Sequence, residues 1–191
     1  MTNVEKAALV LLLTLIFFPR SVQTADPGLT ELETADPGLT ELKPAVSDVW
    51  LVQCVVEDDP STCTMNQQQH LQVEVDGEQK VVGRLLKATV LYAEDPITGT
   101  RDPHISIDLP LGVTLAPGAA INVDDGQQLD WPYLQCTNAG CAISNKLDGE
   151  LLSALKRGKI LLVAYRAWGA EKNTIIRVPL KGFTKAFNSI Q

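Results

Sequence analysis

The sequence predicts an all-β antiparallel sandwich with one or two short helices. After Asp48, several short segments are either strongly apolar or alternate between apolar and polar residues, which is typical of buried and half-buried strands. Turn signals built from Gly, Pro, Asn and Asp recur about every eight to twelve residues. One segment has the apolar face and the end signals of a convincing helix. Many short strands without regularly alternating helices indicate a sandwich rather than a parallel α/β fold.

The composition fits one domain with short extensions. The chain has 191 residues, of which 45% are apolar and 20% are charged, and its formal net charge is −7. These values are ordinary for a single globular domain. No run of Lys or Arg forms a stripe that could neutralise a line of phosphates, so nucleic acid is a poor candidate partner. The same acidic balance argues against docking on anionic lipid.

The N-terminus has the features of an export signal. Lys6 precedes an apolar run of twelve residues, Ala7 to Phe18, which Pro19 and Arg20 end. A short basic start followed by an apolar run is typical of secretory signals, and twelve residues are too few to span a bilayer comfortably. We expect residues 1–24 to be a signal peptide and no integral membrane span to remain after its cleavage.

A duplicated decapeptide follows this signal. The strings "TADPGLTELE" and "TADPGLTELK" occupy residues 24–43. Each copy contains an Asp-Pro-Gly turn signal and a Leu-Thr-Glu-Leu segment that is too short to be a stable helix alone. Repeat architectures need longer and more numerous units. We therefore expect residues 25–47 to be a flexible linker and residues 48–191 to form the domain.

The first strands are expected between residues 49 and 92. "VWLVQCVV", residues 49–56, is apolar on both faces, which is typical of a central strand. Trp50 in this strand is expected to be buried near Cys54. "LQVEV" and "KVVGRLLKATVLY" flank the turn signal "DGEQ", which predicts a long hairpin. Residues 93–103 then read as a projecting polar loop.

The next segments are expected to be shorter strands. "HISIDL", residues 104–109, alternates apolar residues with His104, Ser106 and Asp108, so one face should be buried and the other solvated. The segment from Leu109 to Cys136 is divided by Pro and Gly residues, which limits its strands to about five residues.

Two helices and a hairpin are expected near the C-terminus. Asp148 is a suitable N-cap for "GELLSALKR", and Gly158 is a suitable stop,. "KILLVAYRAW" and "NTIIRVPL" flank "GAEK" and predict the last hairpin. "GFTKAFNSI" then predicts a short helix that presents Phe183 and Phe187 from one face.

The four cysteines are expected to form disulfides. An even number of Cys in an exported chain favours disulfides, and local pairing of Cys54 with Cys63 and of Cys136 with Cys141 is preferred among three possible pairings. Zinc is disfavoured because the Cys spacing is too wide and the two histidines, His70 and His104, are distant from them in sequence. A redox centre is disfavoured because "CTNAGC" lacks a two-residue spacing.

No catalytic constellation is evident in the sequence. There is no nucleophile elbow, and neither histidine has a partnered Ser or Cys. Asp124, Asp125 and Asp130 lack the regular ligand alternation of a helix-flanked calcium loop, so a solvated turn is favoured. We expect no cofactor and no metal. Trp131 and Trp168 lie next to turn residues and are expected to be partly exposed.

Several strings together resemble the invasion-associated locus B family of bacterial envelope proteins. The strings are "DVWLVQC", Cys63, "IDLPLGVTLAPGAAINVDDGQ", "CTNAGC", "LLSALKRGK" and "VPLKGFTKAF". They extend from about Trp50 to Phe187, which is nearly all of the expected domain. The resemblance implies an exported, immunoglobulin-like sandwich, and in some intracellular bacteria the family is associated with entry into host cells.

The resemblance brings structural residues and no catalytic ones. The four cysteines match the paired positions of the family, which supports local disulfides. Pro110 and Gly112 are interpreted as turning the chain between strands, and Gly182 as letting Phe183 reach the core.

These observations lead to one functional hypothesis and two alternatives. We expect an exported, non-enzymatic binding or accessory module of the cell envelope, linked to host-cell invasion and virulence. It would be periplasmic, associated with the outer membrane, or secreted, and its partner would be an unidentified envelope or host-cell protein. The alternatives are an envelope thiol oxidoreductase using Cys136 and Cys141, and a structural subunit of an envelope complex.

Overall fold

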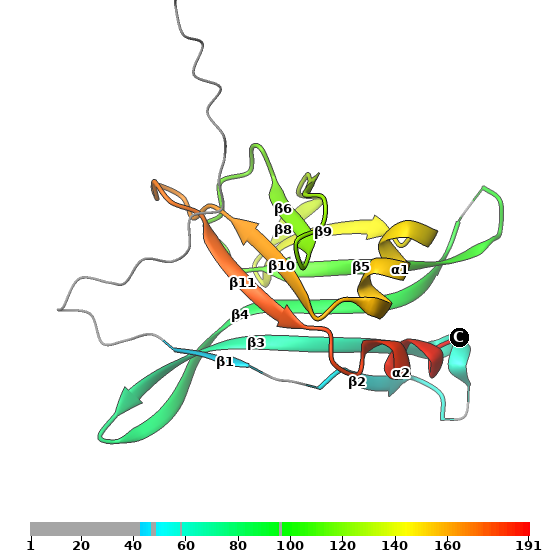
Figure 1. Cartoon of the computed structure of the whole chain (residues 1–191), viewed down its shortest axis with the longest axis horizontal. Coiled ribbons are helices and arrows are strands. Elements are labelled where there is room, and N and C mark those ends of the chain that lie inside the picture. Colours follow the sequence, from blue (N-terminus) through cyan, green and yellow to red (C-terminus); the bar gives the residue numbers. More distant parts are fainter. Residues whose placement is uncertain (1–42, 47–48, 58, 96) are drawn as a thin grey trace, which may run out of the picture. The chain divides into compact units, whose positions relative to one another are not determined.

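Two antiparallel sheets make up the β-sandwich, as the sequence predicts. The computed structural model describes residues 43–46, 49–57, 59–95 and 97–191, and the expected signal and most of the expected linker lie outside them. Figure 1 shows the strands of the smaller sheet running obliquely across those of the larger one. The core lies between the two sheets and under the two helices.

The larger sheet has the order β1-β3-β4-β5-β9-β8, with β2 also paired to β3. Its strands are β1 (Lys43–Val46), β2 (Leu51–Cys54), β3 (Cys63–Val75), β4 (Glu78–Glu94), β5 (Arg101–Leu109), β8 (Gln135–Thr137) and β9 (Gly140–Lys146). The smaller sheet has the order β11-β10-β6-β7. Its strands are β6 (Ala119–Val123), β7 (Leu129–Trp131), β10 (Ile160–Tyr165) and β11 (Thr174–Pro179).

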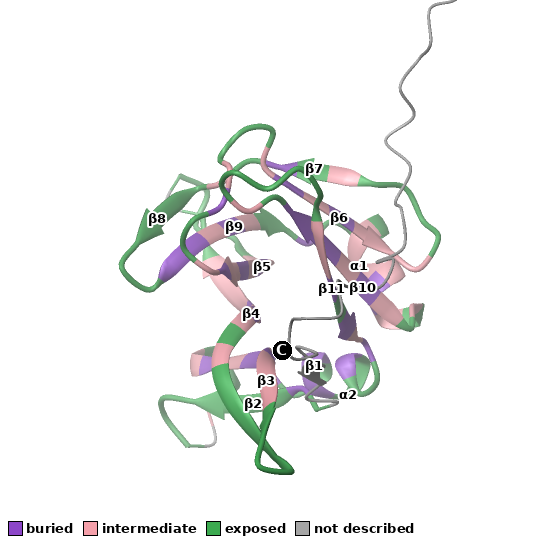
Figure 2. Cartoon of the chain, turned by 90° about the vertical axis from the view of Figure 1, so that its left-hand side faces the viewer, coloured by how far each residue is buried: buried purple, intermediate pink, exposed green. Residues whose placement is uncertain are grey.

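The long hairpin of β3 and β4 is confirmed. Asp76 and Gly77 both have positive φ, 56° and 81°, the conformation that a tight Asp-Gly hairpin turn requires. The register shifts twice, between Gln69 and His70 and between Leu71 and Gln72, and such bulges bend a strand pair. In Figure 2 the tip of this hairpin is exposed while its base contributes to the core.

Alternation along β5 is also confirmed. Ile105, Ile107 and Leu109 are at most 1% exposed, while the residues between them are partly exposed. Opposite Ile107, the neighbouring strands β4 and β9 place Ala88 and Ile143, both of which are fully buried. Every second residue of the central strands therefore faces the core.

Helix α1 (Gly149–Arg157) begins and ends at the residues that the sequence indicates. The Asp148 carboxylate accepts a hydrogen bond from the Leu151 amide at 2.7 Å and caps the helix. Gly158 is the C-cap, and a Cβ at this position would lie 2.3 Å from Val123 Cγ1. The close approach of the helix end to β6 therefore requires glycine.

Helix α2 (Phe183–Asn188) closes one side of the core. It starts after Gly182, which has a φ of 85°. Phe183 and Phe187 are fully buried and stack with their ring centroids 6.0 Å apart. Trp50 meets Phe183 edge-on at 5.0 Å, and its Nε1 donates a hydrogen bond to the Pro179 carbonyl at 3.1 Å.

The expectation of a central strand at residues 49–56 is wrong. Strand β2 covers only four residues, all of them exposed, and among the described strands it pairs with β3 alone. Burial on two faces therefore does not explain why residues 49–56 are so apolar. Trp50 is the residue of this segment that enters the core, and the disulfide from Cys54 to Cys63 fixes the strand to its neighbour.

The expected partial exposure of Trp131 is also wrong, because this side chain is 4% exposed. Its position in β7 is opposite Ala119 of β6, so the ring faces the core. Gly118 has a φ of 109°, and a Cβ there would lie 2.3 Å from the Trp131 carbonyl oxygen. This close backbone approach leaves no room for a side chain at position 118.

Within the described part of the chain, no helix is both long and apolar enough to cross a membrane.

Candidate functional site

The most exposed tryptophan lies on a surface built by two loops. Trp168 is 81% exposed, and the loop after β5 adds Leu111 at 57% and Leu115 at 60%. We call Leu111, Leu115 and Trp168 the loop surface. Exposed large apolar side chains on neighbouring segments are candidates for a protein interaction site.

Backbone pairing between the two loops fixes the loop surface. Val113 and Ala167 form an isolated antiparallel bridge. The Trp168 amide donates to the Gly112 carbonyl at 2.6 Å, and the Thr114 amide donates to the Arg166 carbonyl at 2.7 Å. Val113 is buried beneath them. The exposed side chains are therefore carried by a rigid pair of segments.

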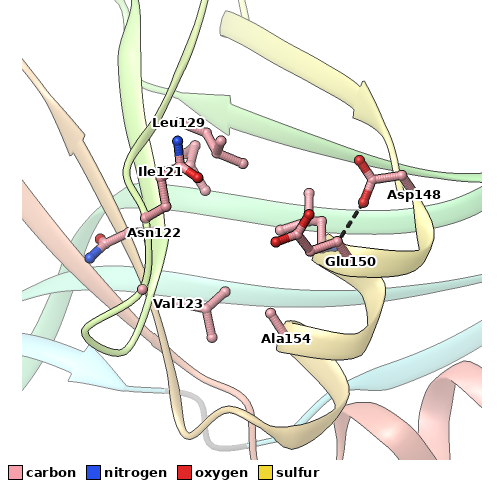
Figure 3. Close-up of a pocket in the computed structure, with 10 residues that line it drawn as sticks. Ile121, Asn122, Val123, Leu129, Asp148, Glu150 and Ala154 are labelled. Atoms are coloured by element: carbon pink, nitrogen blue, oxygen red, sulfur yellow. Dashed lines mark hydrogen bonds between the residues drawn. The ribbon is translucent and has the colours of Figure 1, made fainter.

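A second candidate is a pocket between β6 and α1, shown in Figure 3. It has a volume of about 150 Å³. Its apolar wall consists of Ile121, Val123, Leu129, Leu151 and Ala154, and its polar lining consists of Asn122, Gly126, Gln127, Asp148 and Glu150.

Two carboxylates give the pocket a negative rim. Asp148 is held by its hydrogen bond to the Leu151 amide, and Figure 3 shows the Glu150 side chain reaching from α1 toward β6. Asn122 points away from the helix and donates to the Asp124 carbonyl at 3.0 Å. An aliphatic group that ends in a positive charge would complement this lining.

Asp124, the first acidic residue after β6, has a structural role. Asp124 accepts hydrogen bonds from the Lys159 amide at 3.1 Å and from the Ile160 amide at 2.9 Å. These bonds attach the turn after β6 to the start of β10. Among the described residues, no three His, Cys, Asp or Glu side chains gather where they could hold a metal ion.

Neither histidine joins a catalytic arrangement in the described structure. His70 lies on β3, and His104 lies on β5 opposite Lys146. No hydrogen bond links either imidazole to a Ser or Cys side chain of the described residues.

Both predicted disulfides are present, Cys54–Cys63 and Cys136–Cys141. In each pair the two cysteines lie directly opposite each other on neighbouring antiparallel strands. The strands that they attach, β2 and β8, are short, and all their residues are exposed. The disulfides thus hold two strands that bury little surface of their own.

The remaining sequence-predicted residues belong to the scaffold. Pro110 and Gly112 lie in the loop between β5 and β6, where Gly112 has a φ of 83°. Trp50, Gly182 and Phe183 meet around α2, and Gly158 ends α1. None of these six lines the pocket, and Gly112 supports the loop surface through its carbonyl.

Sequence reasoning missed Leu111, Leu115 and the pocket. A usable signal was present for the leucines, because "LPLGVTLAPG" places both among turn residues, where no strand face can bury them. No local signal identifies the pocket, since β6 and α1 meet only through the tertiary fold.

Burial, and secondarily the nearby Tyr165, raises the pKa of Tyr133 to about 12. The Tyr133 hydroxyl is buried and has no hydrogen-bond partner in the described structure. An unfolded tyrosine loses its proton near pH 10. The stability that Tyr133 contributes by staying neutral is therefore complete below about pH 10 and is lost as pH rises from about 10 to 12.

Replacing Tyr133 with Phe is expected to reduce this alkaline loss of stability. It also removes an unpaired buried hydroxyl, so the free energy of unfolding at pH 7 should stay level or rise by about 1 kcal/mol. Urea unfolding at pH 7, 9 and 11 measures both effects. The control is Tyr165→Phe, which removes a hydroxyl bonded to Thr174 and should be destabilising at pH 7. A destabilised Tyr133→Phe protein at pH 7 would show that the hydroxyl is satisfied.

The chain is similar to proteins of other bacteria that are named invasion protein B. The family model described as invasion associated locus B (IalB) protein matches residues 50–191. An invasion protein B homolog of Brucella abortus strain 2308 is 26% identical over 142 residues, covering 74% of this chain and 75% of that protein. Invasion protein B of Bartonella bacilliformis is 23% identical over 145 residues, covering 74% and 71%.

A solved structure shares the fold. The crystal structure of invasion associated protein b from Bartonella henselae superposes with a TM-score of 0.54 at 22% identity. The match covers 78% of this chain and 95% of that one.

Proposed function

Because the chain belongs to the invasion associated locus B family, whose model matches residues 50–191, we propose that it is an exported, non-enzymatic envelope protein that binds another protein. The relatives named invasion protein B carry names of a process rather than of a reaction. Two disulfides support an oxidising compartment outside the cytoplasm,. The partner would be an envelope or host-cell protein, and the link to host-cell invasion is part of this proposal.

The domain boundaries are part of the same proposal. Residues 1–24 would act as the export signal and residues 25–47 as a linker, the end of which, residues 43–46, pairs with β3 as strand β1 of the larger sheet. The protein would then reside in the periplasm, at the outer membrane or outside the cell.

The observation that carries the binding role is the exposure of Trp168 on a loop whose backbone pairs with the loop that carries Leu111. Trp is enriched among residues that dominate binding energy at protein interfaces. A tryptophan that only filled a gap at the edge of the core would be mostly covered, whereas Trp168 is 81% exposed. Its backbone is also held in place by Gly112, so little conformational entropy is lost when a partner covers the ring.

Site-specific photocrosslinking in intact cells tests this proposal. A photoreactive phenylalanine at position 168 is expected to give a discrete adduct with one protein. The same residue at position 177, which is exposed on β11, is the matched control and should not give that adduct. Leu111→Ser should weaken the adduct formed from position 168 by about tenfold, since a buried leucine contributes about 1.5 kcal/mol or more.

Identical adducts from positions 168 and 177 would contradict the proposal, because the contact would then not be specific to the loop surface. So would the absence of any adduct from position 168 in cells grown under infection-like and ordinary conditions.

A further inference from the structure

Two short basic strings come together at the ends of the helices. "KRGK" ends α1, and "KGFTK" begins α2. The Leu180 amide donates to the Lys159 carbonyl at 2.8 Å, and the Thr184 hydroxyl donates to the Lys156 carbonyl at 2.9 Å. We call the five cations of these strings the helix-end patch: Lys156, Arg157, Lys159, Lys181 and Lys185.

The charges of this patch are not neutralised by ion pairs. Across the described residues, the one ion pair joins Lys146 to Asp102, which lie outside the patch. Four of the five cations are exposed. The fifth, Lys156, has its Nζ 4.4 Å from the centroid of the Phe187 ring, an interaction that leaves its charge in place.

Asp124 is an acidic residue that lies against the patch, beside Lys159. The Asp124 carboxylate already accepts backbone hydrogen bonds at the start of β10. The two strings thus bring five cations to the helix ends in a chain whose net charge is −7. At about 0.1 M salt, charges more than about 10 Å away are largely screened. A surface that approaches the helix ends thus experiences mainly the local positive charge.

The cations are spread over two helix ends. None of them lines the pocket beside β6 or the smaller cavity near β8 and β9. A single phosphate is normally held by groups that converge on one point. A spread of flexible lysines instead matches an array of negative charges, such as the headgroups of a lipid bilayer.

We propose that the helix-end patch docks the protein on a bilayer surface that contains anionic phospholipids. This reverses the expectation drawn from the overall acidic composition, because the local arrangement of charge outweighs the total. The docking does not depend on the protein partner proposed above.

The position of the patch leaves the loop surface accessible. Lys159 directly precedes β10, and Trp168 follows its other end after Tyr165. Six extended residues span about 20 Å. A bilayer bound at the helix ends would therefore lie at one end of this strand, and the loop surface would lie at the other.

Vesicle binding by matched charge variants tests the proposal. The full chain is mixed with phosphatidylcholine vesicles that either contain or lack phosphatidylglycerol, and the bound fraction is measured by sedimentation. The wild type is expected to bind the anionic vesicles more strongly, and Lys181→Glu/Lys185→Glu should weaken this binding about thirty-fold or more. The control is Lys80→Glu/Lys172→Glu, which changes the net charge equally at exposed sites outside the patch and should stay within about threefold of wild type.

The possible results distinguish binding through the helix-end patch from binding through other parts of the protein. Every variant carries the same apolar N-terminal run, so its contribution is constant in the comparison. Equal binding of the wild type to both vesicle types would overturn the proposal, because it would indicate that the protein binds by apolar insertion. Equal weakening of binding by the two double variants would also overturn it, because binding would then depend on the net charge and not on the patch. Binding to a soluble sulfated polysaccharide without binding to anionic vesicles would also overturn it.

Discussion

Replacing Phe183 with Ala is expected to lower the free energy of unfolding by about 3–5 kcal/mol. The Phe183 side chain is fully buried, stacks on Phe187 and meets Trp50 edge-on. Its loss would leave a cavity at the point where α2, β2 and the core meet. Because domains are stable by only about 5–15 kcal/mol, this single change should bring the protein close to unfolding at room temperature. Urea unfolding followed by fluorescence measures the effect.

Trp168→Ala is the matched control, since it also removes a large aromatic side chain. The exposed position of Trp168 predicts a change of about 0.5 kcal/mol or less. If Phe183→Ala does not fold, Phe183→Leu should still do so with a smaller loss. Equal free energies of unfolding for Phe183→Ala and Trp168→Ala would show that the packing of α2 on the core does not stabilise the fold.

The features that the sequence predicted well are those set by neighbouring residues. The Asp76-Gly77 turn fixes its own hairpin through positive φ. Asp148 and Gly158 mark the limits of α1 because capping depends on a few adjacent residues. The alternation along β5 is likewise visible without knowing its partners.

The features that could not be predicted from the sequence depend on which segments of the chain lie next to each other in the fold. The sequence of β2 does not indicate whether this strand pairs with one neighbouring strand or with two. Its position at the edge of the sheet could therefore not be predicted. Trp131 is buried because Ala119 lies opposite it. The helix-end patch needs the contact between Lys159 and Leu180, which unites two basic strings that are each too short to stand out.

The loop surface and the helix-end patch together suggest how one small sandwich could serve two contacts. Both are attached to the hairpin of β10 and β11, at opposite ends. The hairpin is anchored in the core through Val163 and Val178, which are fully buried. Substitutions on either surface should therefore change binding without changing the fold, which makes the two proposals separately testable.

Removing the second disulfide through Cys136→Ala/Cys141→Ala is expected to lower the free energy of unfolding by about 2 kcal/mol. Strand β8 has three exposed residues and, within the described part of the chain, pairs only with β9, so little else holds it. Alanine is preferred to serine because Cys141 is 3% exposed, and a buried hydroxyl would add a cost of its own. Thermal unfolding under non-reducing conditions measures the loss.

The matched variant Cys54→Ala/Cys63→Ala removes the other disulfide, whose cysteines are nine rather than five residues apart. Its loss should be larger by about 0.5 kcal/mol, because closing a longer loop restricts the unfolded chain more. A structural disulfide also predicts no difference between wild type and variant in disulfide exchange with a model peptide. An exchange activity that Cys136→Ala/Cys141→Ala abolishes, with stability unchanged, would instead favour the thiol oxidoreductase. The unfolding and disulfide-exchange measurements together decide whether "CTNAGC" forms a structural disulfide that attaches β8 to β9 or a reactive redox centre.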